Sequence, residues 1–414
     1  MFLQDLLSRN TGSSDILVLT DQCDATQCGV SQDVALVPST TLNYTDLNVH
    51  FEFGGAINSA EVNGNIASAP VAISNARVNE QFLGAIKETN LPFGQENLSG
   101  LVGAGFPAPI ASPIEMELIQ ASLPSNAQGV DVSNKFLNTI LSNAPLFTRL
   151  ILEGQFEQPM FTVTLERETF EIGGNIGQLT LGGLPDGVLN DSLTWVPVRL
   201  YTPQQGGIPS PSDIPNEGTT AILGPQNVVN KIYSTIASSP QNLDPTGSTP
   251  PEIPCNVPVA LTFVIGGKQF PLDPRDFFLQ QSSTETCNAD ALQLMDTPSP
   301  TALMSWVLGA TFMRSNLVAF YFGNFTHPSR DPPRIGFLST VPANASLEFS
   351  SDVKKASASG GQFPGSMIVA PTGTFAATTT NSVGVAQQPT PISSISTPQE
   401  SGRGDANGSW FKLK

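Results

Sequence analysis

The chain carries the stretch NTGSSDIL at Asn10–Leu17 and repeats it as NEGTTAIL at Asn216–Leu223, 206 positions further on. A second stretch, SGLVGAGF at Ser99–Phe106, returns as SWVLGATF at Ser305–Phe312 with the same offset. Two unrelated motifs that share one offset indicate a duplicated structural unit. The sequence therefore predicts two similar lobes, each with a polar Asn-x-Gly-hydroxyl loop and, about 90 residues later, an apolar pair followed by Gly.

The residue types in the repeated loop indicate a tight polar turn. Gly permits the turn, and the two hydroxyl groups after it can bond the backbone or the polar side chain beside them. A pseudo-twofold axis between the lobes would bring Asn10 and Asn216 face to face, with the apolar-apolar-Gly segments beside them as buried strands.

Strand patterns predominate over helix patterns in the rest of the chain. Helices are expected at Ile114–Ala121 and Gln226–Ser238, and a tight turn is expected at Gly266-Gly267. Strands are expected at Val49–Phe53, Ala69–Ser74, Gly100–Val102, Met160–Leu165, Gln178–Leu181, Val259–Ile265, Gln269–Leu272 and Leu317–Phe322.

Composition narrows the range of functions. A net charge of −17 and a pI near 4.4 argue against a nucleic-acid partner, which needs clustered Lys and Arg. His50 and His327 are the only histidines, and no close Cys pair accompanies them, so we expect no metal site and no cofactor. No apolar run approaches the length of a transmembrane helix.

Taken together, these motifs resemble those of the pepsin-like aspartic peptidases, peptidase family A1. Each lobe of those acid proteases carries Asp-Thr-Gly-Ser/Thr and a later hydrophobic-hydrophobic-Gly element. The resemblance covers roughly residues 4 to 345 and includes Leu179–Gly183, Trp195–Val198 and Leu223–Pro225. It implies a mostly β, bilobal pepsin-like fold, with two similar antiparallel β lobes and a cleft between them.

The resemblance also implies domain limits. Residues 1–163 would form the N-terminal lobe, without the family's first strands, and residues 164–345 the C-terminal lobe. Residues 346–414 are rich in Ser, Thr, Gly and Pro and are expected to form a disordered tail. Since Met1–Arg9 holds neither those strands nor a signal peptide, a truncated or mispredicted reading frame is expected.

The family's mechanism uses two carboxylates that share one proton, one acting as base toward water and the other as acid. In this chain the two matching positions hold Asn10 and Asn216. A carboxamide has nearly the same shape as a carboxyl group but takes no proton from water at a useful pH. Hydrolysis by the family's route is therefore expected to be essentially abolished.

Other positions of the implied site also depart from the family pattern. Glu217 replaces the second motif's Thr, Ile57 falls at the flap Tyr, and Leu17 falls at the Trp that bonds this Tyr. The substrate cleft implied by the resemblance comprises Thr11, Gly12, Ser13, Ile57, Glu217, Gly218 and Thr219.

Cysteine and sequon patterns bear on the compartment. The spacings of Cys23 with Cys28 and of Cys255 with Cys287 are similar to the family's disulfide loops, the alternative being free buried thiols. Asn-x-Ser/Thr sequons fit a glycoprotein of the extracellular or secretory pathway. The candidate sites are Asn43, Asn190, Asn324 and Asn344, whereas glycosylation is not expected at Asn97, beside the presumed buried repeat element.

Three hypotheses for the function follow. The first is a non-catalytic, monomeric homologue that binds an extended peptide or a partner protein in the inter-lobe cleft, where main-chain hydrogen bonds suffice. The second is an active aspartic-type endopeptidase, which requires both Asn assignments to be wrong or both residues to be deamidated. The third is a decayed or mispredicted gene product. The sequence is compatible both with a cleft that binds peptide and with a cleft that has no function.

Overall fold

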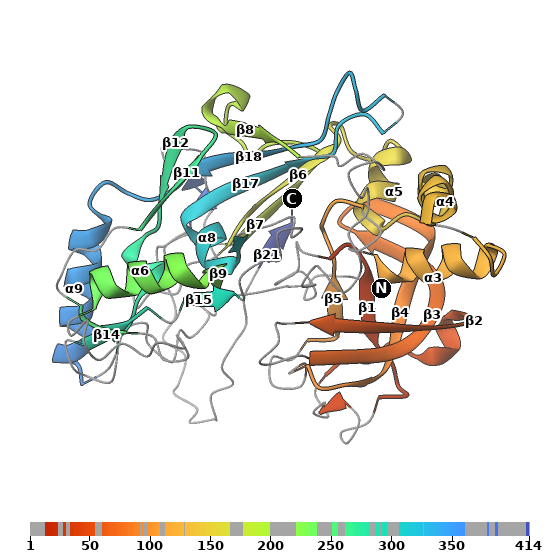
Figure 1. Cartoon of the computed structure of the whole chain (residues 1–414), viewed down its shortest axis with the longest axis horizontal. Helices are drawn as coiled ribbons and strands as arrows, with labels where there is room; N and C mark the ends of the chain where they lie inside the picture. The colour runs from red at the N-terminus through yellow and green to blue at the C-terminus, as the bar shows by residue number, and fades with distance from the viewer. Residues whose placement is uncertain are drawn as a thin grey trace, which may run out of the picture.

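The structure is a computed structural model with two β-rich bodies, an N-terminal lobe built from β1–β5 and α3–α5 and a C-terminal lobe built from the elements that follow (Figure 1). It describes residues 13–23, 28–29, 34–53, 60–91, 93, 98–107, 112–127, 129–165, 177–198, 221–237, 251–255, 261–280, 286–289, 291–295, 306–325, 327–360, 379–380, 386–387 and 411–413.

The N-terminal lobe is a five-stranded sheet with the order β2-β3-β4-β1-β5. Inward side chains alternate along β2, where Val49, Phe51 and Phe53 are buried and their neighbours are exposed, as expected for a strand with one covered face. The strands are β1 (Ile16–Leu19), β2 (Asn43–Phe53), β3 (Ala60–Ile73), β4 (Ala76–Thr89) and β5 (Gly100–Val102), with a short 3-10 helix at Ser39–Thr41.

Three helices lie beside this sheet; the first and the third contact its strands, and the second packs on the other two helices (Figure 1). They are α3 (Pro113–Ser122), α4 (Gly129–Asn143) and α5 (Leu146–Leu152). The first confirms the predicted helix, and it begins with a capping Ser112 and a Pro at its first position. The other two were not predicted.

A six-stranded sheet with the order β21-β7-β6-β17-β18-β8 forms the largest part of the C-terminal lobe. Its strands are β6 (Met160–Thr164), β7 (Gly177–Leu181), β8 (Thr194–Pro197), β17 (Asn316–Tyr321), β18 (Arg334–Ser339) and β21 (Phe411–Leu413), with a 3-10 helix at Asn190–Ser192. β6, β7 and β17 confirm predicted strands.

Smaller sheets complete this lobe. β11 and β12 form the predicted hairpin, and its turn residues Gly266 and Gly267 have positive φ angles of 57° and 80°. The strands are β9 (Ile222–Pro225), β10 (Glu252–Pro254), β11 (Thr262–Ile265), β12 (Lys268–Pro271), β13 (Leu279–Gln280), β14 (Thr286–Asn288), β15 (Leu292–Met295) and β16 (Val307–Leu308), with a further pair at β19 (Thr379–Thr380) and β20 (Ala386–Gln387). The helices are α6 (Gln226–Ile236), α7 (Pro274–Phe277), α8 (Ala310–Ser315) and α9 (Ala345–Ala358).

Aromatic side chains join the two lobes. Phe161 on β6 stacks on Phe320 of β17 with ring centroids 4.8 Å apart, and Phe147 of α5 lies 4.8 Å from Phe161. Phe106, which follows β5, lies 4.9 Å from Phe322. One buried cluster therefore continues from the N-terminal sheet into the C-terminal sheet.

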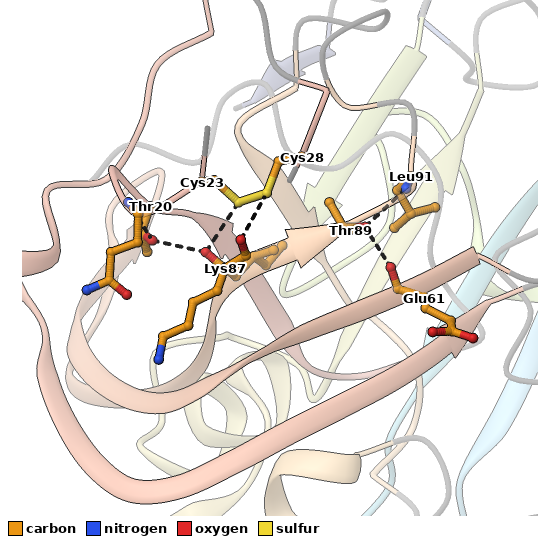
Figure 2. The surroundings of a disulfide bond; sticks show 9 residues. Thr20, Cys23, Cys28, Glu61, Lys87, Thr89 and Leu91 are labelled. Carbon is orange, nitrogen blue, oxygen red and sulfur yellow. Dashed lines mark hydrogen bonds between the residues drawn. A yellow bond between two sulfur atoms is a disulfide. The ribbon is translucent and has the colours of Figure 1, made fainter. Parts of the chain in front are cut away.

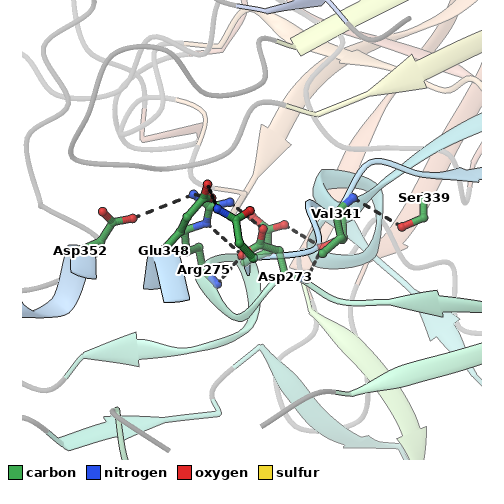
Figure 3. A network of polar contacts seen from close by, with 9 residues as sticks. Asp273, Arg275, Ser339, Val341, Glu348 and Asp352 are labelled. Carbon is green, nitrogen blue, oxygen red and sulfur yellow. Dashed lines mark hydrogen bonds and ion pairs between the residues drawn. The ribbon is translucent and has the colours of Figure 1, made fainter. Parts of the chain in front are cut away.

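Helix α9 corrects the prediction that the disordered tail begins at residue 346. Phe349, Val353 and Ala356 recur at helical spacing on one face and are buried. Arg275 of α7 also lies 2.7 Å from a carboxylate oxygen of Glu348 (Figure 3). The Ser- and Ala-rich composition concealed this amphipathic pattern.

Both expected disulfides are present, Cys23–Cys28 and Cys255–Cys287. The first lies against the end of β4, where its sulfur atoms are 3.4 Å and 3.5 Å from the carbonyl oxygens of Ile86 and Lys87 (Figure 2). The second joins Cys255, the residue after β10, to Cys287 in β14. Among the described helices, none has the length and apolar character needed to span a membrane.

Candidate functional site

The duplication predicted from the sequence is visible in the strands that follow the two motifs. β1 lies between a parallel partner, β4, and an antiparallel partner, β5. β9 lies in the same way between parallel β15 and antiparallel β16. The pairs Ile16–Val102 and Leu17–Leu101 of the first unit become Ile222–Leu308 and Leu223–Val307 in the second, each residue moved by the same offset.

Backbone contacts hold the end of the first motif loop. Ser13, Ser14 and Asp15 are buried, and the Gly103 N–H donates to the Asp15 carbonyl oxygen at 2.7 Å. The Gly105 N–H donates to the Ser13 carbonyl oxygen at 2.9 Å. A Cβ on Gly103 would lie 2.5 Å from the carbonyl carbon of Ser14. The Gly of the apolar-apolar-Gly element is therefore required for this close backbone approach.

The second motif leads into a more apolar environment. Ala221 and Ile222 are buried, and the Ile222 N–H donates to the Ala291 carbonyl oxygen at 2.8 Å. Gly224 faces the ring of Trp306, which a Cβ would meet at 2.2 Å. With the offset of 206, Gly224 corresponds to Val18 and Trp306 to Gly100, which pair in the first unit, so the glycine stands on the other strand of this pair in the second unit.

Most of the predicted cleft residues lie outside the described part of the chain. Ser13 is described and buried. β2 ends at Phe53, which pairs with Ala60 at the start of β3, and the flap position falls between these two residues. The predictions that lie outside the described residues concern Asn10, Thr11, Gly12, Ile57, Asn216, Glu217, Gly218 and Thr219.

Sequence reasoning missed the role of Asp15. Its carboxylate accepts hydrogen bonds from Ser112 Oγ at 2.5 Å and from the Ile114 N–H at 2.9 Å. These bonds connect the residue before β1 to the N-terminus of α3. Burial raises the pKa of Asp15 to about 7, and the two hydrogen bonds offset part of that shift. An available signal was Ser112-Pro113 ahead of a helix, since this pair marks a helix N-terminus.

The sequence model of the family described as eukaryotic aspartyl protease matches residues 6–327. The chain belongs to this aspartyl protease family. The matched region includes both repeated motifs, so the duplicated strand units belong to the family's fold. The resemblance predicted from the motifs is confirmed.

Similar proteins include two cathepsins and an aspartyl peptidase. Cathepsin E of Mus musculus is 24% identical over 336 residues, which cover 76% of this chain and 73% of that protein. Cathepsin E-B of Xenopus laevis is 25% identical over 353 residues, 80% of this chain and 75% of that protein. Major aspartyl peptidase 1 of Cryptococcus neoformans var. grubii is 22% identical over 362 residues, 81% of this chain and 66% of that protein.

Family membership has consequences for binding and compartment. The pepsin-like fold binds peptide substrates in a cleft. The two disulfides of this aspartyl protease homologue are consistent with the extracellular space or the secretory pathway, where thiols are oxidised.

Proposed function

We propose that this protein is a non-catalytic member of the aspartyl protease family that binds an extended peptide or a partner protein between its lobes. The observation that carries the proposal is the residue type at two equivalent positions. Asn10 and Asn216 each stand six residues before the first residue of β1 and β9, respectively. The shared register of these strands supports their equivalence.

The chemistry of a carboxamide pair argues against hydrolysis. General acid–base catalysis needs one group that accepts a proton from water and one that donates a proton to the leaving nitrogen. The Asn side chain offers an oxygen acceptor and an NH₂ donor, but it does not exchange a proton at any useful pH. Hydrogen bonding to a bound backbone survives such a replacement, whereas proton transfer does not.

The binding test uses the full chain, purified from a secretory host. It is incubated with an unfolded protein substrate between about pH 3 and pH 6, with and without a transition-state peptide inhibitor of aspartic peptidases. The expected result is no cleavage and saturable calorimetric binding of the inhibitor. Absence of binding would refute the peptide-binding role, and recovery of only aggregated protein would favour a decayed gene product.

An active endopeptidase is the second candidate, and the names of the relatives favour it. Inhibitor-sensitive cleavage by the unmodified chain would establish it and overturn the proposal. A double variant, Asn10→Asp with Asn216→Asp, sharpens the comparison. We expect it to gain little activity, because Ile57 and Glu217 remain unlike the family pattern. High activity would mean that only the two carboxylates are missing.

Secretion, N-glycosylation and a monomeric state complete the proposal. The sequon asparagines Asn43, Asn190, Asn324 and Asn344 are exposed, as an acceptor for a glycan must be. Treatment of the secreted protein with an N-glycosidase is expected to increase its gel mobility, and size-exclusion chromatography with light scattering is expected to give the mass of one chain.

A further inference from the structure

The ring of Trp195 lies beside a sequon at one edge of the six-stranded sheet. Trp195 belongs to β8, the edge strand of that sheet (Figure 1). A Cβ on Gly336 of the neighbouring strand would lie 2.8 Å from the ring, so the indole covers this glycine. Trp195 Nε1 donates to the Asn190 carbonyl oxygen at 3.3 Å, which places the edge of the ring at the sequon. The Trp195 side chain is nevertheless only half-buried.

Neighbouring side chains hold this ring in one orientation. The Tyr321 ring lies 6.2 Å from the Trp195 ring at an interplanar angle of 76°. The guanidinium carbon of Arg334 lies 3.8 Å from the centroid of the Tyr321 ring and 5.3 Å from that of Trp195. Asp331 accepts from Tyr321 Oη at 2.7 Å and from Arg334 at 3.2 Å. These contacts make Trp195 a rigid aromatic surface, and binding to such a surface costs little side-chain entropy.

Apolar surface continues from Trp195 to the residue that precedes the sequon. Leu189 is 71% exposed, and Asn190, the first residue of the 3-10 helix, is exposed as well. Ser192 Oγ donates to the Leu189 carbonyl oxygen at 2.6 Å, which fixes this short helix against Leu189. We call Leu189, Asn190 and Trp195 the Trp195 patch. It combines a glycan acceptor with two apolar side chains.

The other candidate acceptors lack this combination. The side-chain amides of Asn324 and Asn344 already form hydrogen bonds within the fold. Asn43 begins β2 and is followed by Tyr44, which is 39% exposed. Successive side chains of a strand point to opposite faces, so the Tyr44 ring lies on the face away from Asn43. Asn43 is therefore a matched comparison for Asn190.

We propose that Asn190 is a structural glycosylation site, at which the first N-acetylglucosamine of an N-glycan packs on Leu189 and Trp195. One face of a pyranose ring presents C–H groups that can pack on an aromatic ring and an aliphatic side chain, while its hydroxyl groups stay in water. Attachment to Asn190 makes this contact intramolecular, so it needs no affinity for free sugar. The inference rests on the proposed N-glycosylation, and it adds that one of the glycans stabilises the edge of the six-stranded sheet.

The size of the effect follows from the surface that the sugar would cover. Covering part of an exposed leucine and packing on one aromatic ring should together lower the unfolding equilibrium constant about 3- to 10-fold. Only the first sugar reaches the patch, so the rest of the glycan should add little. Trimming every glycan to a single N-acetylglucosamine should therefore preserve the stabilisation, and complete removal should abolish it.

The decisive experiment uses the full chain secreted from a glycosylating host. Glycopeptide mass spectrometry is expected to find Asn190 occupied. In urea unfolding, Asn190→Gln should raise the unfolding equilibrium constant about 3- to 10-fold, whereas the control Asn43→Gln should change it less than about twofold. Wild type trimmed to one sugar per site should behave like untrimmed protein. An unoccupied Asn190, equal effects in the two variants, or trimmed protein as unstable as Asn190→Gln would overturn the inference.

A double-mutant cycle tests the packing itself. Leu189→Ser leaves the sequon intact and changes an exposed side chain, so the variant should fold. In this background the loss caused by Asn190→Gln should shrink by at least about half, and an undiminished loss would refute packing on the patch. If Asn190→Gln is not secreted, Ser192→Ala removes the same glycan, keeps Asn190 and should give the same loss.

These outcomes are separate from those of the cleft-binding test. Wild type that binds no peptide inhibitor, but loses stability in Asn190→Gln, would contradict only the peptide-binding proposal. Wild type that carries glycans at other sequons and not at Asn190 would contradict only the inference about the Trp195 patch. Absence of glycan from every sequon would refute both the proposed glycosylation and this inference.

Discussion

The two lobes bury an aspartate in two different ways. Asp15 of the N-terminal lobe accepts from a hydroxyl and a backbone N–H, and no cation is paired with it in the described residues. Asp273 of the C-terminal lobe, fully buried, accepts from Arg275 Nε at 3.0 Å and Nη2 at 2.8 Å (Figure 3). A guanidinium keeps its charge at any working pH, whereas a carboxyl proton is lost as the pH rises. The difference shows that one fold can hold one buried carboxyl group with uncharged hydrogen-bond donors and another with a guanidinium.

The largest expected effect comes from removing the guanidinium. Arg275→Met leaves the buried Asp273 without its cation and also breaks the pair with Glu348 on α9. Loss of one partner of a buried pair costs about 3–5 kcal/mol of unfolding free energy. Urea unfolding at neutral pH measures the loss.

Arg330→Met is the matched control, because Arg330 is an exposed arginine of the same lobe. It should change the unfolding free energy by less than about 0.5 kcal/mol. If the two variants are equally stable, Arg275 does not neutralise Asp273 in solution, and the contrast between the lobes fails.

The second contrast concerns the glycines beside the duplicated strands. An added Cβ at Gly103 would meet the backbone of Ser14, whereas one at Gly224 would meet the ring of Trp306. Backbone cannot give way without moving the motif loop, but a side chain can rotate. Gly103→Ala should therefore cost about 3 kcal/mol and Gly224→Ala about 1–2 kcal/mol, measured by chemical denaturation.

A rescue variant separates these two causes. Trp306→Leu should recover most of the loss in Gly224→Ala, because it removes the ring that an added methyl group would meet. No single side-chain change should recover Gly103→Ala. Equal losses in the two glycine variants would show that the ring of Trp306 gives way no more easily than the backbone of Ser14.

Much of this arrangement could be predicted because it depends on local signals. The repeat at one offset predicted equivalent strands, and the register of β1 with β5 and of β9 with β16 follows that offset residue by residue. Cysteine spacing together with the family resemblance predicted both disulfides. The Asn assignments and the cleft positions around them stay predictions, since those residues lie outside the described part of the chain.

What the sequence concealed depends on contacts between distant segments. Asp15 and Ser112 are 97 positions apart, so nothing local marks Asp15 as a partner of α3. The residues of α9 have the composition of a low-complexity tail. Only the packing of α9 against α7 shows why Phe349 and Val353 are buried. Arg275 forms an ion pair with Glu348 of α9, 73 positions further along the chain, and no short motif predicts this pair.

The smallest of these effects concerns the capping serine. Ser112→Ala removes the acceptor of the Glu115 N–H and one donor to Asp15, at a cost of about 1–2 kcal/mol. The Ser112 hydrogen bond lowers the pKa of Asp15, so its loss raises the folded-state pKa further. The unfolding free energy should therefore fall more at about pH 8 than at about pH 5. Ser122→Ala, at the other end of α3, is the control and should show no such pH difference; a uniform loss for Ser112→Ala would mean that the serine caps the helix without acting on Asp15.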